Sequence, residues 1–157
     1  MPMLTQYFDD QQFDDELVIV SPDAGRVKVA RNFARKLGVH WAVMEKERPA
    51  QQVAEIGYVV GDVKGKTAVL VDDMIDTAGT LCAAARTVLD EGAARVIACA
   101  THGVFSGPAY ERLPYEESGI ERIVVTDTIP LRPGQPENLT VLSTAQVLAD
   151  SIRRIFA

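Results

Sequence analysis

Short apolar runs alternate along the chain with segments in which apolar residues recur at helical spacing. Seven runs have the character of β-strands, and they cover residues 17–20, 40–44, 58–60, 67–71, 95–101, 120–126 and 139–142. The run at 67–71 is continuously apolar, as is typical of a strand in the middle of a parallel sheet, because such a strand is covered on both faces. The pattern therefore predicts a largely buried sheet.

Helical periodicity fills several of the intervals between these strands. Residues 27–37 place five apolar side chains on one face and basic side chains outside, and Gly38 follows as a stop signal. Further helices are expected at 81–91, 106–113 and 144–156. This β-α-β alternation predicts an α/β fold in three layers, built on a doubly wound, mainly parallel sheet.

In a sheet of this kind, ligands bind outside the carboxyl ends of the strands. Three loops with polar or charged residues are expected to begin at that edge, after Val20, Met44 and Val71. These loops are the candidates for chemistry.

The loop after Val71 is strongly acidic. Asp72, Asp73 and Asp76 crowd together, and neither Lys nor Arg lies between Thr67 and Leu81 to neutralise them. Like charges this close oppose each other's ionisation. A hydroxyl-rich ligand or a bound divalent cation would relieve that repulsion.

The same loop continues as Asp76-Thr77-Ala78-Gly79-Thr80, a tight turn that enters a helix. Gly79 lets the backbone approach a ligand closely, the two threonines offer hydroxyls, and the helix start offers free N–H groups. Carboxylates for sugar hydroxyls beside a cradle for phosphate describe a site for a phosphorylated sugar. On the residues alone, a plain strand–turn–helix in which Asp and Thr act as caps is equally open.

Residues 72–80 also resemble the phosphoribosyl-binding motif of type I phosphoribosyltransferases and diphosphokinases. The resemblance implies a type I phosphoribosyltransferase-like fold. It further implies that 76–80 hold the 5-phosphate of a ribose, and that Asp72 and Asp73 face its 2- and 3-hydroxyls.

Ser21-Pro22-Asp23-Ala24-Gly25-Arg26, after Val20, resembles the diphosphokinase signature. In that family the Asp takes part in binding magnesium, so the resemblance assigns that role to Asp23. The chemistry agrees, because Mg²⁺ prefers one or two carboxylates together with water and substrate phosphates. The alternative is a helix-entry loop in which Asp23 is only a cap.

Lys46-Glu47-Arg48-Pro49, after Met44, resembles the Lys–x–Arg–Pro segment that opens the mobile catalytic loop of diphosphokinases. The resemblance implies that Lys46 and Arg48 are catalytic and that Arg48 also contacts the sugar phosphate. Phosphoryl-type transfer needs cations where charge develops on the transferred group. A solvated charged loop is the alternative, and Glu47 departs from the family because many members have a second Arg there.

Composition narrows the possible partners. The chain has 157 residues, a hydrophobic fraction of 47% and a net charge of −6, which suits one compact domain and argues against binding nucleic acid or an anionic membrane. Cys82 and Cys99 fit no zinc spacing, so we interpret them as reduced core residues of a cytoplasmic protein. No apolar run approaches the roughly 20 residues needed to span a bilayer.

The resemblance runs from Tyr7-Phe8 to the last helix and implies a ribose-phosphate diphosphokinase. The implied reaction transfers the diphosphoryl group of ATP to the anomeric hydroxyl of ribose 5-phosphate, giving phosphoribosyl diphosphate and AMP with Mg²⁺. Residues 1–16 resemble a remnant of the family's interdomain connection, and 17–157 its phosphoribosyl-binding domain. The expected partners are ribose 5-phosphate, ATP, and the missing N-terminal half or further subunits of a homo-oligomer.

Two other functions stay open. A non-catalytic regulatory subunit of a synthetase assembly is favoured by Glu47 and by the missing half, whereas the retained Lys46 and Arg48 count against it. A phosphoribosyltransferase that consumes phosphoribosyl diphosphate needs a base-binding hood, and no segment of the sequence suggests one.

Overall fold

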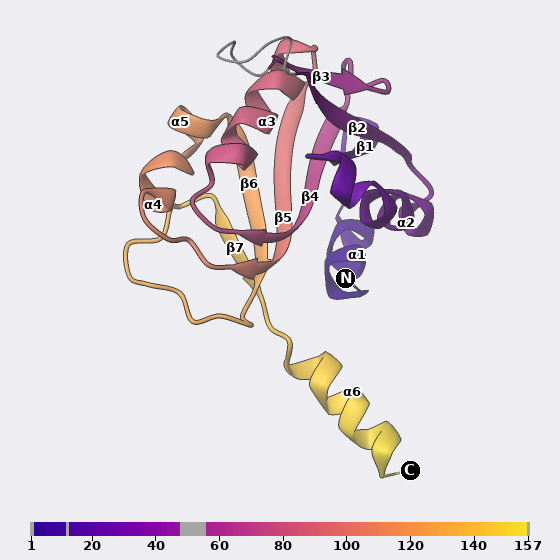
Figure 1. The fold of residues 1–157 in the computed structure, drawn as a ribbon. Helices are drawn as coiled ribbons and strands as arrows, with labels where there is room; N and C mark the ends of the chain where they lie inside the picture. The colour runs from indigo at the N-terminus through magenta and orange to yellow at the C-terminus, as the bar shows by residue number, and fades with distance from the viewer. Residues whose placement is uncertain (1, 12, 48–55, 157) are drawn as a thin grey trace.

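The computed structural model describes residues 2–11, 13–47 and 56–156, which build a sheet between two layers of helices (Figure 1). Within these residues the sheet has seven strands in the order β3-β2-β1-β4-β5-β6-β7. Neighbouring strands are parallel except for the antiparallel pair β2–β3. The strands are β1 Leu17–Ser21, β2 His40–Glu47, β3 Ile56–Val60, β4 Thr67–Ile75, β5 Arg95–Gly103, β6 Ile120–Thr126 and β7 Leu139–Leu142. The predicted α/β fold is confirmed.

The helices cover both faces of the sheet (Figure 1). One face carries α1 Pro2–Asp10 and α2 Val27–Leu37, and the other carries α3 Gly79–Asp90 with the short helices α4 Ala109–Arg112 and α5 Tyr115–Ser118. Successive strand residues point to opposite faces, so Val69 packs under α1 and α2 while Leu70 packs under α3. The result is the expected three layers.

Helix α1 was not predicted, yet it belongs to the core. Leu4 and Phe8 are 0% and 2% exposed, and the Phe8 ring meets Phe33 of α2 edge to face with centroids 5.8 Å apart. The i, i+4 spacing of Leu4 and Phe8 places both on one side of the helix, which explains why nine residues suffice to cover part of the sheet.

Helix α6, Ala145–Ile155, extends away from the rest of the chain (Figure 1). None of its residues is buried, although Leu148 and Ile152 recur at helical spacing. Among the described residues, no helix has both the length and the apolar character that a membrane crossing requires.

Four strands run further than predicted at their carboxyl ends: β1 to Ser21, β2 to Glu47, β4 to Ile75 and β5 to Gly103. The prediction that Asp72 and Asp73 lie in a loop is therefore wrong. Pairing with β5 continues through Asp72 opposite Ala100 and Ile75 opposite Gly103, so backbone hydrogen bonds sustain the strand after its apolar run has ended.

The helix predicted at 106–113 is also wrong in its start. Gly107 has a φ of 51° and is followed by Pro108, which has no N–H to donate, and α4 begins only at Ala109. Helix α3 in turn begins two residues earlier than predicted, at Gly79.

Candidate functional site

The carboxyl ends of β1 and β4 lie next to each other because the two strands pair in parallel, with Leu17 opposite Thr67. The loop after β1 and the end of β4 therefore border one hollow of about 310 Å³. It is lined by Asp23, Asp72, Met74, Ile75, Asp76, Thr77, Ala78, Gly79, Thr80 and Leu81. Seven of the predicted site residues thus meet at one place, and we name this space the acidic hollow.

Asp73, the eighth, reaches this site through Arg26. The Arg26 side chain lies between the two carboxylates, with its Nε 3.3 Å from Asp72 Oδ1 and its Nη2 in contact with Asp73 Oδ2. Sequence reasoning found no cation beside these acids and missed Arg26, which is distant in the chain. The signal that could have found it is topological, because Arg26 follows the strand that pairs with β4.

The local fold of the loop after β1 directs the Arg26 side chain toward Asp72 and Asp73. Ser21 Oγ donates to the Asp23 carbonyl over 2.7 Å, and Asp23 Oδ1 accepts the Arg26 N–H over 3.0 Å at the start of the 3-10 helix η1, Ala24–Arg26. Asp23 is therefore a cap, as one interpretation of the sequence held. Its exposed side chain also borders the acidic hollow.

The two neighbouring carboxyls differ in acidity. Burial, and then the adjacent Asp73 carboxylate, raise the pKa of Asp72 to about 6, against the hydrogen bond that Asp72 Oδ1 accepts from the Asp73 N–H over 2.8 Å. Burial also opposes ionisation of Asp73, but the hydrogen bond with Asp72 and the Arg26 charge outweigh it and lower the Asp73 pKa. Near neutral pH the pair carries close to its full negative charge, and Asp72 is the one that protonates first on acidification.

Residues 76–79 form a turn whose backbone is held in a rare conformation, and we call it the 76–79 turn. Ala78 has a φ of 62°, in the left-handed region, which costs about 1 kcal/mol or more for a residue with a Cβ. Ala78 is the N-cap of α3, and no side chain caps the helix. The interpretation in which Asp76 or a threonine caps α3 is therefore wrong, and the first-turn N–H groups have no intrahelical partner.

A segment beyond β5 contacts this turn. Ser106 Oγ donates to the Asp76 carboxylate, and Arg112 Nη1 donates to the Thr77 carbonyl over 3.1 Å. Neither residue was singled out from the sequence, and only the pairing of β4 with β5 brings them here.

The structure describes only part of the segment that holds the two predicted catalytic cations, Lys46 and Arg48. The Lys46 backbone lies in β2, opposite Gly57 of β3, and not in a loop as expected. Arg48 lies outside the described residues, as does Pro49. Within the described part of the chain, no three His, Cys, Asp or Glu side chains form a group that could hold a metal ion.

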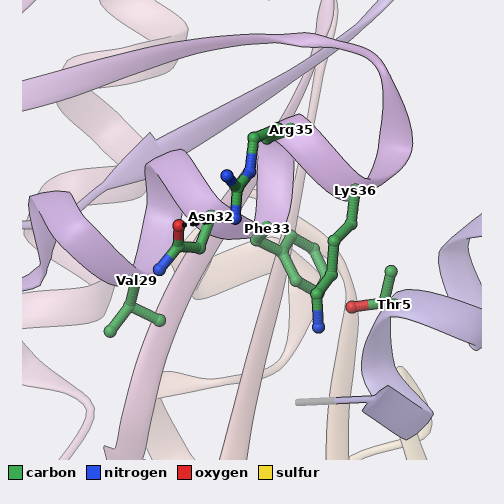
Figure 2. A pocket seen from close by; sticks show the side chains of 6 residues that line it. All are labelled: Thr5, Val29, Asn32, Phe33, Arg35 and Lys36. Carbon is green, nitrogen blue, oxygen red and sulfur yellow. Dashed lines mark hydrogen bonds between the residues drawn. The ribbon is translucent and has the colours of Figure 1, made fainter.

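A separate hollow of about 240 Å³ lies between α1 and α2, lined by Thr5, Val29, Asn32, Phe33, Arg35 and Lys36 (Figure 2). The Phe33 ring forms part of its wall, and Arg35 Nη2 lies 3.4 Å from Asn32 Oδ1. It contains none of the predicted site residues.

The fold and the acidic hollow together indicate a class of α/β domain that offers carboxylates and a helix start at the carboxyl edge of a parallel sheet. Adenine phosphoribosyltransferase from Leishmania tarentolae shares the fold, with a TM-score of 0.59 at 19% identity over 79% of this chain and 66% of that chain. The family described as phosphoribosyl synthetase-associated domain matches residues 45–157, and the chain belongs to this family.

Individual relatives agree with the family. Ribose-phosphate pyrophosphokinase of Caldanaerobacter subterraneus subsp. tengcongensis is 52% identical over 98% of this chain and 48% of its own length, and that of Aquifex aeolicus is 49% identical over 99% and 49%. The crystal structure of phosphoribosylpyrophosphate synthetase from Mycobacterium smegmatis is 46% identical, with a TM-score of 0.87 over 98% of this chain and 49% of that chain. The resemblance stated from the motifs is confirmed. The chain spans about half the length of the curated relatives it matches.

Proposed function

We propose that this chain carries the ribose 5-phosphate site of a ribose-phosphate pyrophosphokinase. The whole enzyme transfers the diphosphoryl group of ATP to the anomeric hydroxyl of ribose 5-phosphate, giving phosphoribosyl diphosphate and AMP. The observation that carries the proposal is the meeting of Asp72 and the 76–79 turn in one hollow, with Asp73 held beside it by Arg26. The relatives named as ribose-phosphate pyrophosphokinases support it.

The chemistry of the hollow suits the two ends of this substrate. Asp72 and Asp73 are acceptors for the 2- and 3-hydroxyls, and hydroxyl donors would offset the repulsion between the two carboxylates. The first-turn N–H groups of α3 and the hydroxyls of Thr77 and Thr80 are donors for the 5-phosphate. Lys46 and Arg48 are proposed to balance charge on the diphosphoryl group as it moves.

Mg²⁺ is the proposed cofactor, and Asp23 is the residue proposed to contact it. Asp23 offers an exposed carboxylate at the border of the acidic hollow, and one carboxylate completed by water and phosphate oxygens is a usual environment for this ion. When bound, the ion would neutralise charge on the phosphate groups.

The partners follow from the same proposal. The chain is expected to bind ribose 5-phosphate itself. It is expected to act on ATP together with a further part of the enzyme, which in the relatives makes up about half of the length and which would lie on the same or another subunit.

Calorimetric titration with ribose 5-phosphate at pH 8 tests the site. Replacing Asp72 and Asp73 together by Asn should abolish binding without unfolding the domain. The matched control replaces Asp9 and Asp10, an adjacent exposed acidic pair on α1, by Asn. It changes the net charge by the same amount as the Asp72/Asp73 variant. Binding by the Asp72/Asp73 variant at the affinity of the unmodified protein would refute the assignment.

AMP release from ATP, with ribose 5-phosphate and Mg²⁺ present, tests the reaction. The expected result is sugar-dependent AMP when the corresponding first half of a relative is added in trans. Sugar binding without AMP under that condition would favour a regulatory subunit over an enzyme.

A further inference from the structure

The segment that leaves β5, residues 104–112, contacts three consecutive residues just before Ala78. The backbone N–H groups of Val104 and Phe105 both donate to the Ile75 carbonyl, each over 3.0 Å. Ser106 bonds the Asp76 carboxylate, and Arg112 bonds the Thr77 carbonyl. One segment thus bonds all three residues that directly precede the left-handed Ala78.

The backbone of Arg112 is anchored by the packing of α4, although the residue itself is exposed. Ala109, at the start of α4, and Leu113, directly after Arg112, are both fully buried. The thiol of Cys82 donates to the Arg112 carbonyl over 3.5 Å. The Arg112 guanidinium lies close to Gly79, because a Cβ added there would be in tight contact with Arg112 Nη1, at 3.2 Å.

Arg112 approaches the 76–79 turn from outside the acidic hollow. It lines a second hollow of about 270 Å³, together with Gly79, Cys82, Arg86, Glu111 and Glu117. Asp72 and Asp76 line the acidic hollow and do not line this second one. The Thr77 carbonyl is therefore bonded to a group that lines a different space from the one proposed for the ligand.

The direction of that carbonyl determines the conformation of Ala78. Thr77 C=O and Ala78 N–H belong to one planar peptide unit, so rotating the unit changes the ψ of Thr77 and the φ of Ala78 together. A rotated unit would relieve the left-handed Ala78 and would turn a carbonyl oxygen, a poor neighbour for an anion, away from Arg112. The hydrogen bond from Arg112 opposes this rotation.

We infer that Arg112 is a positioning residue for the phosphate end of the site. Through the Thr77 carbonyl it keeps the Ala78 peptide in the orientation that leaves the first-turn N–H groups of α3 open to a phosphate. It also places a positive charge behind residues 76–80, which contain no Lys or Arg. Ser106 assists by holding Asp76. The inference rests on the proposed function, since the phosphate is that of ribose 5-phosphate.

Calorimetry on three single variants tests the inference. Arg112→Met should weaken binding of ribose 5-phosphate about ten-fold, the effect expected for one hydrogen bond from a charged donor, and Arg112→Lys should restore part of it. Arg86→Met is the matched control, because Arg86 is exposed, lines the same second hollow and donates to a backbone carbonyl, that of Glu117 over 2.9 Å, but has no bond to the turn. It should change affinity less than about two-fold.

The backbone amide signals of Ala78 and Gly79 in the ligand-free protein provide a second readout. They should shift and broaden in Arg112→Met and stay unchanged in Arg86→Met, while both variants keep the thermal midpoint within a few degrees. Unperturbed amide signals in Arg112→Met, or equal perturbation by both variants, would overturn the inference. If the unmodified protein fails to bind ribose 5-phosphate, the proposed function falls, and these signals still decide whether Arg112 positions the turn.

Discussion

Asp72→Asn should stabilise the domain at neutral pH while it removes sugar binding. Burial first, and then Asp73, raise the pKa of Asp72 from its ordinary 3.8 to about 6 in the folded protein. The folded state therefore holds this proton more tightly than the unfolded state does. Consequently the free energy of unfolding of the unmodified protein falls as the pH rises from about 4 through about 6, and this contribution becomes constant about one pH unit above the folded-state pKa.

The size of the effect follows from the same pKa difference. A difference of about two in pKa corresponds to about 3 kcal/mol. The Asp72 side chain is 25% exposed and shares its proton equilibrium with Asp73, so solvent screening and relaxation reduce the expected gain to about 1–2 kcal/mol. An Asn side chain keeps the oxygen that accepts the Asp73 N–H and loses only the charge.

Urea unfolding followed by circular dichroism, at several pH values from 5 to 8, measures this effect. The variant should exceed the unmodified protein by about 1–2 kcal/mol at pH 8, and the gap should shrink steadily towards pH 5. Asp14→Asn, which removes one negative charge from an exposed residue in the segment before β1, is the control for the change in net charge. A variant that is no more stable at pH 8, or a gap of constant size across the range, would refute the reasoning.

Three further changes test other parts of the structure. Arg26→Met removes the cation between the two acids, so an NMR titration of the Asp72 carboxyl should give a midpoint above about 6, and an unchanged midpoint would contradict the pairing. Ala78→Gly should raise the free energy of unfolding by about 0.5 kcal/mol, because relief of the left-handed strain outweighs the added freedom of the unfolded chain; a loss in urea unfolding would show that no strain is present. Phe8→Ala should cost about 3 kcal/mol in the same assay because it empties the space against Phe33, and a loss below about 1 kcal/mol would mean that α1 is not part of the core.

The sequence predicted those elements whose side-chain pattern reports burial directly. Helix α2 and strands β6 and β7 have the predicted bounds, and in α2 the apolar residues recur at regular helical spacing. The missed α1 left a signal in the spacing of Leu4 and Phe8, which was too short to stand out among acidic neighbours.

The errors near the site have a different cause. Asp72 and Asp73 have the composition of a loop, but the neighbouring strand supplies backbone partners that hydropathy does not report. The acidic motif could be predicted because its residues are adjacent in the sequence, and most of them line one hollow. Arg26 and Arg112 could not be found in this way, because only the order of strands in the sheet brings them to the motif.

That separation has a physical rationale. A Lys or Arg within residues 72–80 could reach several of the acids and compete with the ligand for them, whereas cations fixed on other elements each contact a chosen point. Arg26 arrives from the β1 side and bonds the two carboxylates, and Arg112 arrives from the β5 side and bonds a carbonyl of the turn. In the proposed site, one arginine would therefore act on the protonation of the sugar end and the other on the shape of the phosphate end, and β4, which lies between β1 and β5, would carry both ends.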